Sequence, residues 1–191
     1  EIKTARRAAV TGLAAVSPLG LDAAATFAAL MDGRSGIGPI THFDVENFSS
    51  KIAGEVRGFD PEQWMEARDV KKVDRFLHFA LAAAKQAIDD SRLDLEAEDR
   101  ERIGVVIGSG IGGLSLLEAQ HKILLERGPG RISPFFIPGM IINMASGMVA
   151  IAHGLKGPNC ATVTACATGN HAIGEALRLI QHGDADVVVA G

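Results

Sequence analysis

One thiol, Cys166, stands where a buried strand is expected to run straight into a helix. Residues 161–164 are small or β-branched and favour a strand, and apolar residues recur at helical spacing over 172–180. The small residues between them let the backbone bend sharply and leave room for a substrate. Unpaired N–H groups at a helix start favour thiolate over thiol and could hold an oxyanion. Cys166 is therefore the candidate nucleophile, and its own N–H is a candidate oxyanion donor.

A packing role is the alternative for Cys166, because free cysteine is among the residue types most often buried. Cys160 is the other cysteine, six positions away, so the two make neither a CxxC pair nor a set of metal ligands. On a continuous strand they would lie too far apart to form a disulfide. We expect two free thiols in a reducing cytoplasm, with no metal and no other cofactor.

Composition limits the classes of protein that this chain can belong to. With 191 residues, of which 47% are hydrophobic, it can bury a core as one α/β domain. A net charge of −4 argues against general nucleic-acid binding. No apolar run is long enough to cross a bilayer, and no secretory signal pattern opens the chain. We therefore expect no nucleic-acid or membrane partner.

Strand and helix patterns alternate along the chain. Strands are expected over 8–11, 51–56, 102–109 and 186–190, and helices over 22–31, 59–66, 73–91, 114–127 and 140–151. Three basic residues, Arg68, Lys71 and Lys72, would form one face at the start of the long helix. Such a run is usually a solvated face, and the functional alternative is a dock for an acidic partner.

Gly108, Gly110 and Gly113 fit the GxGxxG pattern between a strand and a helix, which is the context of a dinucleotide-binding turn. A Rossmann unit also needs a strand ending in an acidic residue about twenty positions on. Here that region is a helix end followed by Gly128 and Pro129. Tight backbone packing is the favoured role of these glycines, and nucleotide binding is the alternative from a different class.

The segment TACATGNHAIGEALRLIQHGDADVVVAG resembles the active-site segment of the β-ketoacyl-acyl-carrier-protein synthases, the condensing enzymes of fatty-acid synthesis. The segments GSGIGGL, SPFFIP and NMASG resemble the elongating type II members, and the resemblance runs from about Arg6 to Gly191. It implies a thiolase-like α/β fold, of which this chain is the N-terminal half of a five-layered αβαβα body. In that family the cysteine matching Cys166 carries the acyl group.

The same resemblance implies a reaction and its partners. The acyl group passes from acyl carrier protein to Cys166, and a decarboxylative Claisen condensation with malonyl-acyl-carrier-protein gives a 3-oxoacyl product. Ile111 would line the acyl channel, while Phe136 and Ile137 would line it from the partner subunit of a homodimer. Arg68, Lys71 and Lys72 would meet the carrier protein.

The family's decarboxylating histidine pair and lysine lie on C-terminal motifs that do not occur here. None of the six histidines matches those positions, and His171 is expected to have a packing or interface role. The chain ends in an apolar strand pattern, which is typical of the middle of a domain. We therefore expect a truncated chain that is inactive alone. The sequence also resembles the ketosynthases of aromatic polyketide pathways, which are therefore an alternative. A non-catalytic partner of the chain-length-factor kind would lack the cysteine, so Cys166 argues against that class.

Overall fold

The computed structural model describes residues 6–191, and its centre is a three-stranded parallel sheet in the order β4-β3-β5. Strand β3 (Ile103–Val106) is the middle strand and is buried along its whole length. It pairs with β4 (Asn159–Cys160) on one side and with β5 (Val187–Ala190) on the other. The Ile and Val run of β3 suits this position, because a parallel strand covered on both faces is apolar throughout.

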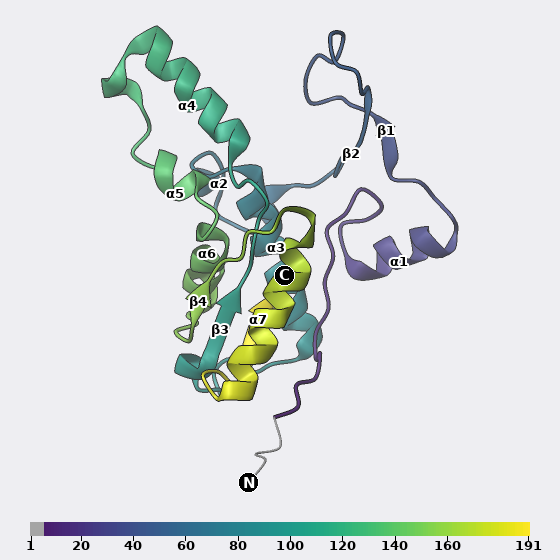
Figure 1. Cartoon of the computed structure of the whole chain (residues 1–191), viewed down its shortest axis with the longest axis vertical. Helices are drawn as coiled ribbons and strands as arrows, with labels where there is room; N and C mark the ends of the chain where they lie inside the picture. Colours follow the sequence, from purple (N-terminus) through teal and green to yellow (C-terminus); the bar gives the residue numbers. More distant parts are fainter. Residues whose placement is uncertain (1–5) are drawn as a thin grey trace.

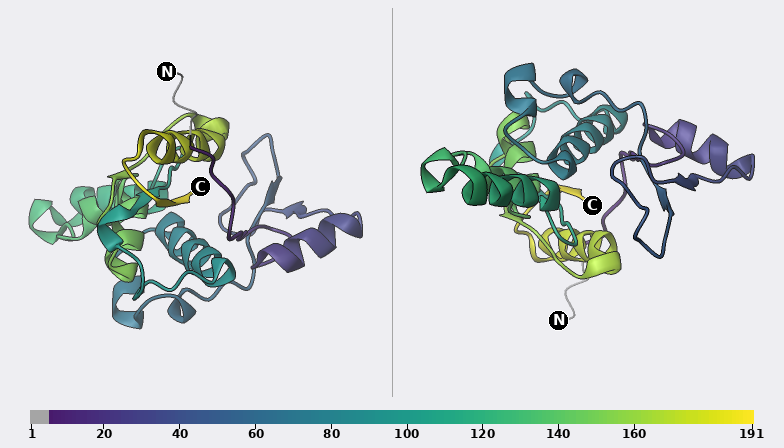
Figure 2. Two further views of the ribbon diagram at one scale, coloured as in Figure 1. Left: turned by 90° about the horizontal axis from the view of Figure 1, so that it is seen from below. Right: turned by 90° about the horizontal axis from the view of Figure 1, so that it is seen from above.

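Helices cover both faces of the sheet (Figures 1 and 2). Helices α3 (Arg75–Ser91) and α6 (Met144–His153) pack together against one face, and α7 (Thr168–His182) covers the other. The buried core on the first face brings together residues of α3, β3 and α6: Leu81, Ala84, Ile103, Val105, Val149 and, after α6, Leu155. The described chain therefore has three layers, helix, sheet and helix.

The other elements extend from this body (Figure 1). Helix α1 (Ala23–Met31) and the hairpin of β1 (Ile37–Pro39) and β2 (Ile52–Gly54) lie on one side, and α4 (Leu114–Arg127) and α5 (Phe136–Met140) on the other. Helix α2 (Ala67–Val70) precedes α3. Single 3-10 turns are η1 (Pro61–Gln63), η2 (Arg100–Arg102), η3 (Pro129–Arg131) and η4 (Ala165–Ala167).

The helices predicted over 22–31, 73–91 and 114–127 are confirmed, with Asp22 capping α1 by accepting a hydrogen bond from the Ala25 N–H at 2.7 Å. The strand predicted over 8–11 is wrong. This segment runs from an Arg6–Asp186 ion pair to a Leu13–Asp90 hydrogen bond without joining a ladder, and Val10 is 84% exposed. Its apolar residues have no strand beside them with which to pair.

The helix predicted over 140–151 also begins later than expected. The chain is extended at Ile141, and α6 starts at Met144. At this break the Met140 carbonyl accepts a tertiary hydrogen bond from the Gly113 N–H at 2.9 Å, and the Met144 N–H instead donates to the Ile141 carbonyl at 3.2 Å. In a continuous helix the Met144 N–H would use that carbonyl. Nearer the start, the helix predicted over 59–66 is only the 3-10 turn η1, and the strand over 51–56 shortens to β2.

Candidate functional site

Cys166 lies at the junction before α7, in the 3-10 turn η4, and it is exposed. The strand predicted over 161–164 is misplaced, because the ladder ends at Cys160 and residues 161–164 pair with no strand among residues 6–191. Helix α7 begins two residues after Cys166 and extends over 15 residues. The thiol therefore sits where the unpaired N–H groups of a long helix begin, as the residue pattern indicated.

Two buried threonines hold the turn around Cys166. The Thr168 hydroxyl accepts a hydrogen bond from the Thr164 N–H at 2.9 Å and donates to the Ala165 carbonyl at 2.7 Å. The Thr162 hydroxyl donates to the Thr168 carbonyl at 3.2 Å. Thr162 and Thr168 are 8% and 6% exposed, respectively. The turn is thus closed from its buried side, while the thiol faces outward.

Ala165, immediately before the candidate nucleophile, has a left-handed backbone with φ of +50°. This region is unfavourable for a residue with a Cβ, and holding a residue there costs of the order of 1–3 kcal/mol. Such strain persists only where surrounding contacts impose it, and it is frequent at functional sites. Here the Ala165 carbonyl accepts two hydrogen bonds, one from the Thr168 backbone N–H and one from the Thr168 hydroxyl.

The glycines of the GxGxxG pattern pack against this turn. A Cβ on Gly108 would lie 2.2 Å from Thr168 Cγ2 and 2.4 Å from the Thr162 carbonyl oxygen, whereas a Cβ on Gly110 would lie 3.7 Å from Ala165 Cα. At the far end of the loop, an Asp74 carboxylate oxygen already accepts the Leu116 N–H of α4 at 2.7 Å. That helix start is occupied by a side chain of the protein, so the structure favours packing over nucleotide binding.

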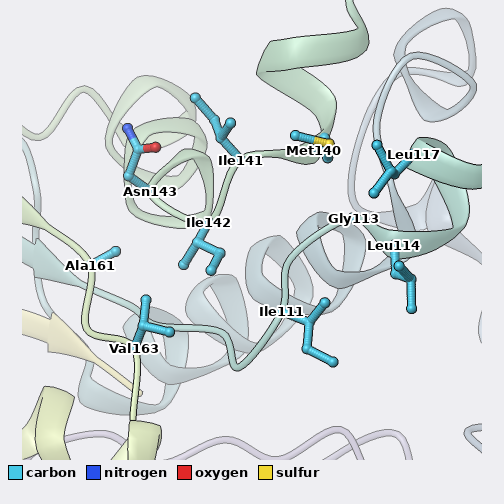
Figure 3. Close-up of a pocket in the computed structure, with 10 residues that line it drawn as sticks. All are labelled: Ile111, Gly113, Leu114, Leu117, Met140, Ile141, Ile142, Asn143, Ala161 and Val163. Atoms are coloured by element: carbon cyan, nitrogen blue, oxygen red, sulfur yellow. The ribbon is translucent and has the colours of Figure 1, made fainter. Parts of the chain in front are cut away.

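An apolar cavity of about 440 Å³ opens beside the glycine loop (Figure 3). Three segments line it, the glycine loop with the first turn of α4, the break between α5 and α6, and the stretch after β4. Its lining residues are Ile111, Gly113, Leu114, Leu117, Met140, Ile141, Ile142, Asn143, Ala161 and Val163. Its size falls in the range of small-molecule sites. In Figure 3 the side chains of Ile142 and Val163 point toward one another.

The predicted channel residues are only partly brought together. Ile111 lines the cavity, but Phe136 and Ile137 lie on α5 and do not line it. The Ile137 side chain is 53% exposed. An origin of these two residues in a partner subunit stays a prediction. Cys166 is not a lining residue either, although Val163, three positions before it, is.

The three basic residues lie before α3, not on it as predicted, because α3 begins at Arg75 and Arg68 belongs to α2. Their charge is partly neutralised. Arg68 Nε lies 2.7 Å from a carboxylate oxygen of Glu66, and Lys72 pairs with Asp69 while its ammonium lies 4.8 Å from the Phe135 ring centre. The Lys72 hydrogen bond is the main reason that the pKa of Asp69 is lowered. Among residues 6–191, Lys71 is exposed and has no carboxylate partner.

The surroundings of the turn include a second thiol and a histidine. Cys160 and Cys166 are both free, as expected. Desolvation and then the Glu175 carboxylate raise the pKa of the Cys160 thiol, which favours its uncharged form. His171 Nδ1 lies 3.3 Å from the Thr164 hydroxyl, and its Nε2 lies 3.7 Å from Glu175.

Sequence reasoning missed the hydrogen-bonding roles of Thr162, Thr168 and Asp74. The signal available for Thr168 was a hydroxyl residue two positions after the nucleophile, at a helix start where such residues form caps.

Within the described part of the chain, no group of three or more His, Cys, Asp or Glu side chains is arranged to hold a metal ion. None of the helices described over 6–191 is long and apolar enough to cross a membrane.

Comparison with known proteins identifies the family. The model of the family "Beta-ketoacyl synthase, N-terminal domain" matches residues 5–191. The chain is 51% and 52% identical over 186 residues to 3-oxoacyl-[acyl-carrier-protein] synthase 2 of Vibrio cholerae and of Coxiella burnetii, respectively. Each match covers 97% of this chain but 45% of the relative, so the chain spans about half the length of these curated relatives.

A solved structure supports the same assignment at the level of the fold. A type II polyketide synthase ketosynthase, in complex with its acyl-carrier protein and bound to a hexaketide, aligns with a TM-score of 0.85 at 25% identity. The alignment covers 98% of this chain and 51% of that one. The fold is therefore thiolase-like, as predicted, and the higher identity to the 3-oxoacyl-[acyl-carrier-protein] synthases favours them over the polyketide alternative. With its cysteine at the start of α7 and a family match over nearly its whole length, the chain belongs to the beta-ketoacyl synthase family.

Proposed function

We propose that this chain carries the acyl-accepting centre of a 3-oxoacyl-[acyl-carrier-protein] synthase. The Cys166 thiol gives up its proton and its sulfur attacks the carbonyl carbon of an acyl-carrier-protein thioester; the bond to the carrier sulfur breaks, that sulfur takes up the proton, and the acyl group becomes a thioester of Cys166. Decarboxylation of malonyl-acyl-carrier-protein then yields a carbanion equivalent. It attacks the acyl-Cys166 carbonyl, forms the new carbon–carbon bond and releases the thiolate with a 3-oxoacyl-carrier product. The observation that carries this proposal is the exposed Cys166 in a closed turn at the start of α7.

The backbone at the turn supports a role in oxyanion binding. The Ala167 N–H donates to the Thr164 carbonyl at 3.0 Å, whereas the Cys166 N–H has no acceptor among residues 6–191. An exposed N–H of this kind, beside the attacking sulfur, can stabilise the negative charge that develops on the thioester oxygen. We propose that the Cys166 N–H is one of the two oxyanion donors.

The apolar cavity that Ile111 lines is our proposed site for part of the acyl chain, since its walls offer alkyl groups from three segments. Phe136 and Ile137, on a helix outside the cavity, would contribute from the second subunit of a homodimer. For the carrier protein we propose docking at Arg68, Lys71 and Lys72, of which Lys71 is the exposed residue without a carboxylate partner in the described chain. A related ketosynthase binds its acyl-carrier protein in a solved complex.

The condensation step needs groups that this chain does not supply. None of its six histidines matches the positions of the family's decarboxylating pair. We propose that residues 1–191 alone do not complete the condensation and that further catalytic groups are required.

Intact-protein mass spectrometry tests the acyl-transfer step. The protein, purified at its native length from its natural source, is incubated with a long-chain acyl-carrier-protein and then mapped by peptide digestion. We expect one acyl adduct, on Cys166. Recombinant protein of the same length provides the matched variants: Cys160→Ala should keep the adduct and Cys166→Ala should lose it. An unmodified Cys166 in the native-length protein would contradict the proposal.

A further inference from the structure

We infer that Thr168 is a positioning residue for the nucleophile: its hydroxyl fixes the turn that aims the Cys166 N–H and thiol. This inference deepens the proposed function and rests on it for the reaction, whereas the hydrogen bonds of Thr168 do not depend on that function. One oxygen atom, Thr168 Oγ1, binds the Thr164 N–H at 2.9 Å and the Ala165 carbonyl at 2.7 Å. Both ends of the Thr164–Ala165 dipeptide are therefore tied to a single point.

This double contact controls the direction of the Cys166 N–H. The Ala165 carbonyl and the Cys166 N–H belong to the same peptide group, which is planar and trans, so the two bonds point in opposite directions. The Thr168 backbone N–H and hydroxyl both hold this carbonyl, and the hydroxyl alone also holds the Thr164 N–H, so the Cys166 N–H points away from Thr168, where no acceptor of the described chain meets it. The left-handed φ of +50° at Ala165 is the backbone conformation that accompanies this orientation.

The Thr168 side chain is itself held in place. It is 6% exposed, and its methyl group occupies the space left by the missing side chain of Gly108, where a Cβ would come within 2.2 Å of Thr168 Cγ2. The Thr162 hydroxyl binds its carbonyl at 3.2 Å. A β-branched side chain with its methyl group fixed has one way to place its hydroxyl. The methyl group thus anchors the side chain, and the hydroxyl orients the turn.

Two variants separate the role of the Thr168 hydroxyl from that of its methyl group. Thr168→Val keeps the shape and removes the hydroxyl, whereas Thr168→Ser keeps the hydroxyl and removes the methyl group. The lost hydrogen bonds involve a buried hydroxyl, so we expect Thr168→Val to lower the melting temperature, but both variants should remain folded at the temperature of the assay. The acyl-transfer assay on the native-length protein then reports positioning separately from folding.

For Thr168→Val we expect the rate of acyl transfer to Cys166 to fall about 10-fold, because the Thr164 N–H loses its acceptor and the turn shifts, while the Thr168 backbone N–H still holds the Ala165 carbonyl. The loss should be in kcat with KM for the acyl-carrier-protein unchanged, because Thr168 is buried and does not meet the carrier. Thr168→Ser should restore most of the rate. Wild-type rates in Thr168→Val, or equal losses in both variants, would overturn the inference, because the hydroxyl would then not be the part that matters.

Amide hydrogen exchange of the native-length protein supplies a readout that needs no substrate. Removing the acceptor in Thr168→Val should accelerate exchange of the Thr164 N–H, while Thr168→Ser should preserve its protection. Unchanged protection in Thr168→Val would overturn the inference. If the wild-type protein forms no adduct at all, the proposed function fails, and the exchange result still decides whether Thr168 holds the turn.

Discussion

Gly108 and Gly110 stand two positions apart in one loop, yet the structure predicts opposite responses to the same added methyl group. In Gly108→Ala the new Cβ would lie 2.2 Å from Thr168 Cγ2 and 2.4 Å from the backbone oxygen of Thr162. Relieving both contacts requires a displacement of about 1 Å, because carbon atoms pack at roughly 3.5–4.0 Å. One of the two obstacles is backbone, so a rotamer change does not relieve it. In Gly110→Ala the nearest atom is 3.7 Å away, which is an ordinary contact.

Overpacking of a buried contact costs typically 1–3 kcal/mol, and a double clash should reach the upper end, about 3 kcal/mol for Gly108→Ala. For a chain of this size that corresponds to a fall in melting temperature of roughly 6–12 °C. Gly110→Ala should change the free energy of unfolding by less than about 0.5 kcal/mol. Because the displaced atoms belong to Thr162 and Thr168, Gly108→Ala should also slow acyl transfer to Cys166.

Thermal melts and urea titrations of the two variants, followed by circular dichroism, provide the comparison. Gly110→Ala is the matched control, since it has the same substitution, loop and sequence pattern. Equal stability of the two variants would refute the packing argument for Gly108. A dinucleotide-binding loop would require a different result, in which both substitutions leave stability intact and abolish nucleotide binding.

Substitutions at three further positions test other contacts. Asp74→Ala removes the carboxylate that accepts the Leu116 N–H at 2.7 Å and should cost about 1–2 kcal/mol in urea titrations, whereas Asp74→Asn, which keeps an acceptor, should cost less. Ser146→Ala removes a fully buried hydroxyl that accepts the Ile107 N–H at 2.8 Å, and a loss of about 1–3 kcal/mol is expected; an unchanged melting temperature would show that the contact is dispensable. The Thr41 backbone N–H, and then its hydroxyl, lower the pKa of Glu55 from 4.5 to about 2, so its ionised form adds stability above pH 4.5 that is lost as the pH falls toward 2. Glu55→Gln should therefore be less stable at neutral pH and lose less stability over that acid range in pH-dependent melts, and parallel profiles for the two proteins would argue against this role.

Local patterns were sufficient for the longer helices and for the position of the nucleophile. The helix over 114–127 was predicted at the bounds that the structure has, and Cys166 does precede a helix. The helix over 140–151 was predicted too long: the Met140 carbonyl is bound by the Gly113 N–H, and no local pattern reveals a partner that is distant along the chain. The prediction of a strand over 8–11 was wrong for a related reason, because an apolar run forms a strand only where another strand lies beside it.

The sequence by itself determined the α/β class, the family and the candidate nucleophile, because these depend on residue types and on spacings of a few positions. Only the tertiary structure decided that Ala165 is held in a left-handed conformation, that Gly108 makes room for Thr168, and that the Leu116 N–H is bound by Asp74, 42 positions away. Ile111 likewise meets the other cavity walls only after folding, when three separate segments come together. The physical reason is that a site is made of distances between atoms, and distances between remote residues are set by packing.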